Sequence, residues 1–288
     1  MIADYVEALK LRIGVFIGMA AVLGYVATLR EAPAWAALAL LFVTVLAASA
    51  GSGALNHYLD RDLDRRMHRT ARRPLACGRI RHPGRVVALG LGLIVMAVAV
   101  ATWALHPLVA LHVFLGAFTY VVVYTIWLKR RSWLNVVVGG LAGSFAVLGG
   151  GSLARPEFCL PPVLFAAVLF FWSPTHFWSL GIAYADEYAG ARIPMLPAVK
   201  GAASTARSVL LHTAALLVTA ALPFALGLLG GIYLAVTALG SVYLLARNVH
   251  LLASPGDRRR ALQSFHASNL WLLLVFIGVV ADAAARWP

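Results

Sequence analysis

Stretches of about 20 apolar residues recur along the whole chain and are separated by short polar segments. A helix that crosses a bilayer needs about 20 such residues, so the pattern predicts about nine membrane-spanning helices. Their expected ranges are 11–29, 34–58, 86–105, 108–128, 133–152, 161–184, 206–228, 231–247 and 265–284. Only His106-Pro107 separates the third from the fourth, and only residues 229–231 separate the seventh from the eighth. Both pairs are therefore expected to form tight hairpins, within one all-α integral membrane domain over residues 1–288.

The composition excludes a soluble domain. Hydrophobic residues make up 61% of the chain and charged residues 12%, whereas a soluble domain averages about 25% charged residues. The first residues lack the basic start and cleavage site of a signal peptide and the Arg/Ser-rich character of a transit peptide, so neither is expected. The two cysteines, Cys77 and Cys159, fall in loops on opposite sides of the membrane, so we expect no disulfide and no metal-ligand pair.

The positive charge is distributed unequally between the two sets of loops. With the N-terminus inside, 21 of the 24 Lys and Arg residues fall in inside segments, and only Arg30, Arg155 and Arg286 fall outside. This asymmetry follows the positive-inside rule. It predicts a multi-pass protein of a bacterial or archaeal plasma membrane, with a cytoplasmic N-terminus and an outside C-terminus. Topology also explains the net charge of +13, so no nucleic-acid partner is expected.

A dense block of both charge signs, residues 56–80, follows the second span. Within it Asn56, Asp60 and Asp64 are spaced i, i+4, i+8 and share one face of a helix, about 6 Å apart per step. Asp62 lies roughly 200° around from Asp60. Carboxylates with an amide oxygen suit Mg²⁺, which keeps waters and takes one or two carboxylates plus substrate phosphate. We therefore predict a metal site at Asn56, Asp60 and Asp64.

A second loop, just past the sixth span, offers Asp186 and Glu187, which we expect to face the first acidic group and complete the metal site. Basic side chains are then expected around both acidic groups. The guanidinium group of arginine can form paired hydrogen bonds to phosphate oxygens. These basic residues are Arg69, Arg72, Arg73, Lys129, Arg130 and Lys200. Asn135, near the start of the fifth span, is a further candidate ligand for phosphate or a metal-bound water. The arrangement predicts a polyphosphate site.

Two other interpretations compete with this one. Loop charges in membrane proteins commonly set topology and pair with one another, and this remains the better account of Arg61, Asp62, Arg65 and Arg66. An ion-coupled transporter would also use acidic residues, but it would place them near the bilayer midplane on broken helices. Here they lie at the membrane edge, beside arginines that repel cations.

Four segments resemble the UbiA superfamily of intramembrane prenyltransferases, and within it the branch that farnesylates protohaem IX. Residues 56–64 fit its N-x-x-x-D-x-x-x-D motif, and MHRTARRPLACGRI (67–80) continues that resemblance. YTIWLKRRSWLNVVVGGLAGS (124–144) and THFWSLGIAYADEYAGARIPMLPAVKG (175–201) are similar to segments of the haem branch. The first motif alone fits any member of the superfamily.

The resemblance implies a nine-helix fold around a central cavity, with Mg²⁺ as cofactor, farnesyl diphosphate as donor and haem B as acceptor. It implies that Asp60, Asp64 and Lys129 are catalytic and that Arg69, Arg72, Arg73, Lys129, Arg130 and Asn135 bind the diphosphate. The product would be haem O, and haem A synthase or terminal-oxidase assembly factors would be the partners. An aromatic or quinone precursor is the alternative acceptor.

The chain departs from the family pattern at several positions around the expected acceptor cavity. Residues 144–148 read SFAVL where A-x-P-P-L is usual, Thr175 replaces a proline before His176, and Leu11 replaces the proline of K-P-R. Glu187 stands where aspartate is usual and keeps the metal chemistry. A histidine at membrane depth is a functional candidate, so His176 is expected either to contact the haem or to make a hydrogen bond between helices.

Overall fold

The computed structural model describes residues 2–29 and 31–287, so Arg30, expected outside, lies beyond the described residues. Within that part the chain contains helices and no strand. The elements are α1 (Ile2–Ala8), α2 (Leu11–Thr28), α3 (Trp35–Leu59), α4 (Arg61–Asp64), α5 (Pro83–Val100), η1 (Ala101–Leu105), α6 (Pro107–Phe118), η2 (Thr119–Leu128), α7 (Asn135–Gly139), α8 (Leu141–Ala154), α9 (Leu160–Ala183), α10 (Ala185–Gly190), α11 (Leu196–Ala225), α12 (Gly231–Ala253) and α13 (Arg258–Ala284).

Nine helical segments of the described chain are long and apolar enough to cross a membrane, which confirms the predicted number. Two of them, the seventh and the ninth, begin well before the ranges that the apolar pattern indicates. The ninth starts at Arg258 because the Asp257 carboxylate accepts hydrogen bonds from the backbone N–H groups of Arg259 and Arg260 and caps the helix. The seventh starts at Leu196, and Gly201 then breaks it with a φ of 77°.

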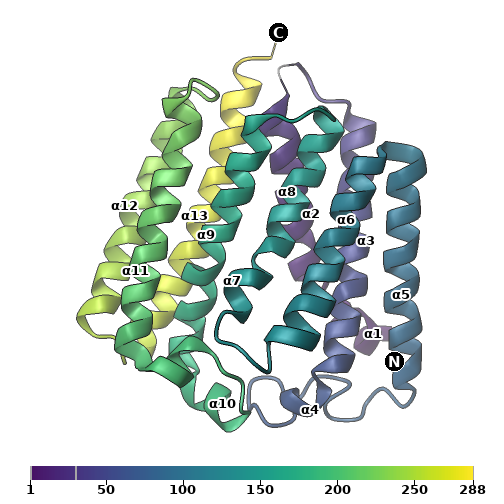
Figure 1. Ribbon diagram of the computed structural model, residues 1–288, viewed down its shortest axis with the longest axis vertical. Coiled ribbons are helices and arrows are strands. Elements are labelled where there is room, and N and C mark those ends of the chain that lie inside the picture. Colours follow the sequence, from purple (N-terminus) through teal and green to yellow (C-terminus); the bar gives the residue numbers. More distant parts are fainter. Residues whose placement is uncertain (1, 30, 288) are drawn as a thin grey trace.

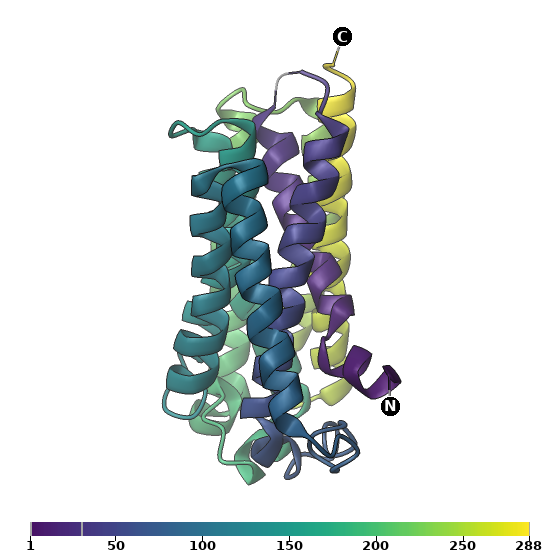
Figure 2. The ribbon, with the colours of Figure 1, turned by 90° about the vertical axis from the view of Figure 1, so that its right-hand side faces the viewer.

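The spans stand side by side in two groups that meet at α9 (Figure 1). The α2, α3, α5, α6 and α8 helices form one group, and α11, α12 and α13 pack with α9 in the other. The short helices α1, α4 and α10 and the long loops gather at one end of the bundle, called here the α4–α10 end, and the C-terminus lies at the other (Figure 1). The α1 helix projects sideways from that end (Figure 2).

Glycines allow the closest helix contacts. A Cβ added to Gly150 of α8 would lie 1.8 Å from the Ala21 backbone oxygen of α2, and one added to Gly24 would lie 2.0 Å from the Val147 oxygen. Small residues commonly permit such approach in membranes, where no hydrophobic force drives helices together. The α2–α8 crossing therefore depends on these two positions having no side chain.

We expect Gly150→Ala to lower the free energy of unfolding by about 2 kcal/mol or more, because the added methyl group meets backbone that cannot yield without moving a helix. Gly92→Ala on α5 is the control, since a Cβ there meets no atom within 4 Å. Thermal unfolding of both variants in detergent measures the difference. Equal melting temperatures would contradict the close-packing account.

Candidate active site

The column formed by Asn56, Asp60 and Asp64 is buried where α3 meets α4 at the α4–α10 end. These residues are 3%, 0% and 3% exposed. The helix breaks at Asp60, but the backbone there keeps φ −92° and ψ −1°, so all three positions stay on one side. Asn56 Nδ2 donates to Asp60 Oδ2 at 2.7 Å. Asp62, by contrast, is exposed on the other side.

A basic side chain contacts each level of the column. Lys10 Nζ donates to Asn56 Oδ1, and Lys129 Nζ forms an ion pair with Asp60 Oδ2. Arg73 Nη1 lies 2.9 Å from both carboxylate oxygens of Asp64. These three cations come from the junction before α2, the end of η2 and the loop after α4. The buried column therefore joins three distant parts of the chain.

Lys10 was not expected to take part in the site, because the sequence shows it only as a loop charge. Its backbone adopts a left-handed conformation, with φ 51° and ψ 40°, between α1 and α2. This turn brings its side chain to Asn56. Burial, assisted by the positive charges of Arg73 and Lys129, lowers the pKa of Lys10 to about 7 against the opposing effect of Asp60 and Asp64.

A ten-residue π-helix, η2, brings the fourth span to the column. The wide helix turn is visible at Lys129, whose backbone N–H donates to the Tyr124 carbonyl five residues earlier at 2.8 Å. Such turns are rare in proteins, and those that occur are often found at functional sites. Thr125, also missed by sequence reasoning, accepts a hydrogen bond of 2.9 Å from Asn56 Nδ2. The π-helix therefore presents Thr125 to Asn56 and Lys129 to Asp60.

The second acidic loop meets the first through one hydrogen bond. The Arg69 backbone N–H donates to Glu187 Oε2 of α10 at 3.2 Å. Asp186 beside it is exposed. Among the described residues, no three His, Cys, Asp or Glu side chains converge closely enough to hold a metal ion. The two loops thus adjoin, but their carboxylates do not form one cluster.

The other predicted diphosphate ligands lie around this column with different partners. Arg130 forms two hydrogen bonds to Asp62, at 2.9 and 2.7 Å, on the exposed side. Their pairing lowers the pKa of Asp62 and raises that of Arg130. Arg72 is exposed, and the Lys200 ammonium lies 4.4 Å from the centre of the Trp133 ring. Asn135 is buried, with its Nδ2 donating to the Ser132 carbonyl at 2.7 Å.

His176 lies inside the interface of α9 and α13. Its Nδ1 is 2.9 Å from Ser268 Oγ, and the rings of Trp172 and Phe265 lie 4.4 Å from it, centre to centre. This is the helix-packing arrangement that was one of the two expectations for His176.

The donor set of the column fits Mg²⁺. Asp60 Oδ1 is buried and has no hydrogen-bond partner in the described chain, and the same holds for Asn135 Oδ1. A buried polar atom without a partner needs an explanation. An anionic oxygen suits Mg²⁺, which takes one or two carboxylates and fills its other positions with water and phosphate. The column, rather than the joint carboxylates of both loops, is therefore the better candidate metal site.

Removing Lys129 should destabilise the protein, because it leaves Asp60 buried and charged without its cation. We expect Lys129→Met to lower the free energy of unfolding by about 3 kcal/mol, and Lys129→Met/Asp60→Asn to recover most of that loss. The exposed Arg131→Met is the matched control. Unfolding of the purified variants in metal-free detergent measures all four proteins. A double variant that is less stable than Lys129→Met would disprove the pairing account.

Comparisons with known proteins identify the family of the chain. The profile of the UbiA prenyltransferase family matches residues 17–280. "Protoheme IX farnesyltransferase 1" of Paramagnetospirillum magneticum is 46% identical over 279 residues, 97% of this chain and 98% of that protein. "Protoheme IX farnesyltransferase" of Pyrobaculum arsenaticum is 39% identical over 282 residues, 97% of this chain and 99% of its own.

Solved structures share the fold at lower identity. A digeranylgeranylglyceryl phosphate synthase superposes with a TM-score of 0.81 at 15% identity and covers 99% of both chains. A UbiA homolog from Archaeoglobus fulgidus bound to DMAPP and Mg²⁺ has a TM-score of 0.69 at 16% identity, over 96% of this chain and 99% of that one. The helix arrangement, the family profile and the full-length relatives together lead to one conclusion: the chain belongs to the UbiA prenyltransferase family.

Proposed function

We propose that this membrane prenyltransferase transfers the farnesyl group of farnesyl diphosphate to a vinyl group of haem B, with Mg²⁺ as its cofactor, to give haem O. The observation that carries the proposal is similarity over nearly the whole length to relatives named for protoheme IX farnesyl transfer. The buried column with its unpartnered Asp60 oxygen supports the donor half of the reaction. Haem A synthase or an oxidase assembly factor would receive the product.

The side chains at the column bind and position the donor. Mg²⁺ held by Asp60 and Asp64 would polarise the diphosphate and make it a better leaving group. Lys129, Arg73 and Lys10 supply cations for the diphosphate oxygens, and Arg69, Arg72 and Arg130 surround the same loop. Asp186 and Glu187 lie at the edge of this site and would orient metal-bound water. The residues act by charge stabilisation and positioning, and none acts as a nucleophile.

The bond changes follow from the two substrates. The allylic C–O bond breaks and its electron pair leaves with the diphosphate. The vinyl π-electrons form the new C–C bond to farnesyl, and water adds to the resulting cation and loses a proton. Apolar helices around the tail keep water away from the allylic cation until the C–C bond has formed. The buried apolar cluster that includes Leu63, Met67 and Trp178 would contribute to this shielding, since Leu63 directly precedes Asp64.

The activity test uses the full chain in liposomes with farnesyl diphosphate, haem B and Mg²⁺, with mass analysis of the extracted haem. We expect farnesylated haem from the wild type, its loss with a chelator, and a decrease of about 100-fold or more for Asp60→Asn and Asp64→Asn. Asp62→Asn, on the exposed side, should stay within about fivefold of the wild type. A prenylated phenol without farnesylated haem would establish the alternative acceptor class instead.

We further propose that the α4–α10 end faces the cytoplasm of a bacterial or archaeal cell. The two cysteines test this orientation, since Cys77 lies at that end and Cys159 lies just before α9 at the other. The Arg79 Nε–H donates to Cys77 Sγ at 3.4 Å and lowers the pKa of that thiol, whereas burial raises the pKa of Cys159.

An impermeant maleimide should therefore label Cys77 in inverted vesicles and not in right-side-out cells. Because a lowered pKa increases the thiolate fraction below the ordinary thiol range, Arg79→Gln should slow Cys77 labelling at pH 7 several-fold, and the difference should disappear above pH ~10. This pH comparison is made in detergent, where the reagent reaches both ends of the protein and the labelling rate of Cys159 serves as the internal control. Labelling of Cys77 from outside intact cells would reverse the proposed orientation.

A further inference from the structure

One face of the first turns of α13 borders a shallow, largely open depression of the surface. It is lined by Arg258, Arg259, Leu262, Gln263 and His266, and is called here the α13 groove. These positions follow i, i+1, i+4, i+5 and i+8, so they form two adjacent rows on one helix face. The groove runs from the loops of the α4–α10 end into the span.

The end of the groove nearest the loops is positively charged. Arg258 and Arg259 are exposed, and in the described residues neither guanidinium forms an ion pair. The nearby Asp257 carboxylate is engaged elsewhere, since it lies 3.6 Å from Arg260 Nε and accepts the backbone N–H groups of Arg259 and Arg260. Two arginines are thus available for anionic groups of a ligand.

Arg258 also connects the groove to the diphosphate site. Its guanidinium carbon lies 5.1 Å from the centre of the Tyr184 ring, and that of Arg69 lies 5.3 Å from the centre of the same ring. The two guanidinium groups are therefore no farther apart than the sum of these distances. Arg69 belongs to the loop after Asp64 and bonds α10 through its backbone. A ligand held by Arg258 would lie next to the wall of the diphosphate site.

The deeper end of the groove carries His266. It is exposed, makes a ring contact with Phe265 at 5.2 Å, and lies two turns, about 12 Å, along α13 from Arg258. Its neighbour His176 is buried and bonded to Ser268, so His266 is the more accessible of the two imidazoles. An ionisable side chain at this depth is costly and commonly functional.

We propose that the α13 groove binds the prenyl acceptor as an amphipathic metallotetrapyrrole that carries carboxylates. Arg258 and Arg259 bind the carboxylates at the rim of the macrocycle, Leu262 packs against its apolar face, and His266 faces its central metal. The order of groups along the groove, cation, apolar residue and imidazole, matches the order of carboxylate, ring and metal in such a ligand. The inference rests on the proposed haem acceptor and adds the site that holds it.

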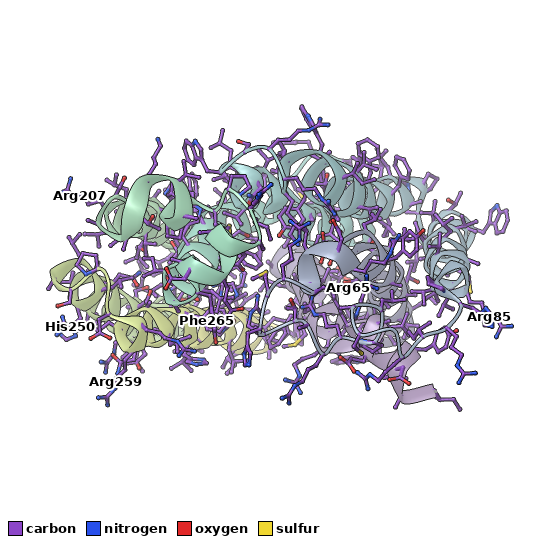
Figure 3. The ribbon with its side chains drawn as sticks, turned by 90° about the horizontal axis from the view of Figure 1, so that it is seen from below. Arg65, Arg85, Arg207, His250, Arg259 and Phe265 are labelled. Atoms are coloured by element: carbon purple, nitrogen blue, oxygen red, sulfur yellow. The ribbon has the colours of Figure 1, made fainter. Side chains whose placement is uncertain are left out.

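Haem titration of the full chain in lipid nanodiscs, without farnesyl diphosphate, tests the groove apart from catalysis. The variants are Arg258→Ala/Arg259→Ala and His266→Ala. Arg85→Ala and His82→Ala are the matched controls, because both residues are exposed and Arg85 lies at the opposite margin of this end of the molecule from Arg259 (Figure 3). Haem B and its dimethyl ester, which lacks free carboxylates, are compared by Soret absorbance and electron paramagnetic resonance.

We expect the double arginine variant to raise the Kd for haem B about tenfold and to leave the Kd for the dimethyl ester unchanged. His266→Ala should alter the Soret position and the iron spin state, and both controls should bind like the wild type. If the groove variants and the controls have the same Kd for haem B, the inference is overturned. Weaker binding of anionic phosphatidylglycerol by the arginine variant with unchanged haem affinity would also overturn it, because that result would make the groove a lipid site.

The same preparations separate this inference from the proposed function. If the wild type farnesylates haem B while every groove variant binds haem normally, the groove assignment is wrong and the function stands. If the wild type binds haem through the groove but yields no farnesylated haem, the proposed reaction is wrong and the binding site stands.

Discussion

The site depends on how two buried carboxylates are neutralised at the end of a membrane span. An unpaired charge removed from water costs several kcal/mol even after the protein relaxes, so Asp60 and Asp64 each require a cation. Lys129 and Arg73 provide them. Lys10 makes the third contact of the column, with the uncharged Asn56. Because these partners come from widely separated segments, the requirement for charge balance also fixes how the spans are arranged around α3.

This arrangement suits a reaction that begins with departure of a diphosphate. Lys129 and Arg73, which neutralise the carboxylates in this structure, would be available to phosphate oxygens if Asp60 and Asp64 held a metal ion. The π-helix η2 and the left-handed turn at Lys10 are both local departures from regular structure, and each places a basic side chain on the column. Two of the irregular segments of the backbone thus lie where the chemistry is expected.

Much of the fold follows from the sequence, because a span must be about 20 apolar residues long. Spacing likewise places Asn56, Asp60 and Asp64 on one face. Lys10 and Thr125 could not be found this way, since their contacts depend on a positive φ and a widened helix turn that no hydrophobic period reveals. The partner of Glu187 could not be predicted from residue types either, because the Glu187 carboxylate accepts a hydrogen bond from the backbone N–H of Arg69 and not from a side chain.

The most direct measurement is an experimental structure with Mg²⁺ and a non-hydrolysable farnesyl diphosphate analogue. If the column is the metal site, Mg²⁺ will be bound by Asp60 Oδ1 and Asp64, with Lys129 and Arg73 moved from the carboxylates onto diphosphate oxygens. A diphosphate bound elsewhere, with the Lys129–Asp60 and Arg73–Asp64 pairs intact, would contradict the account.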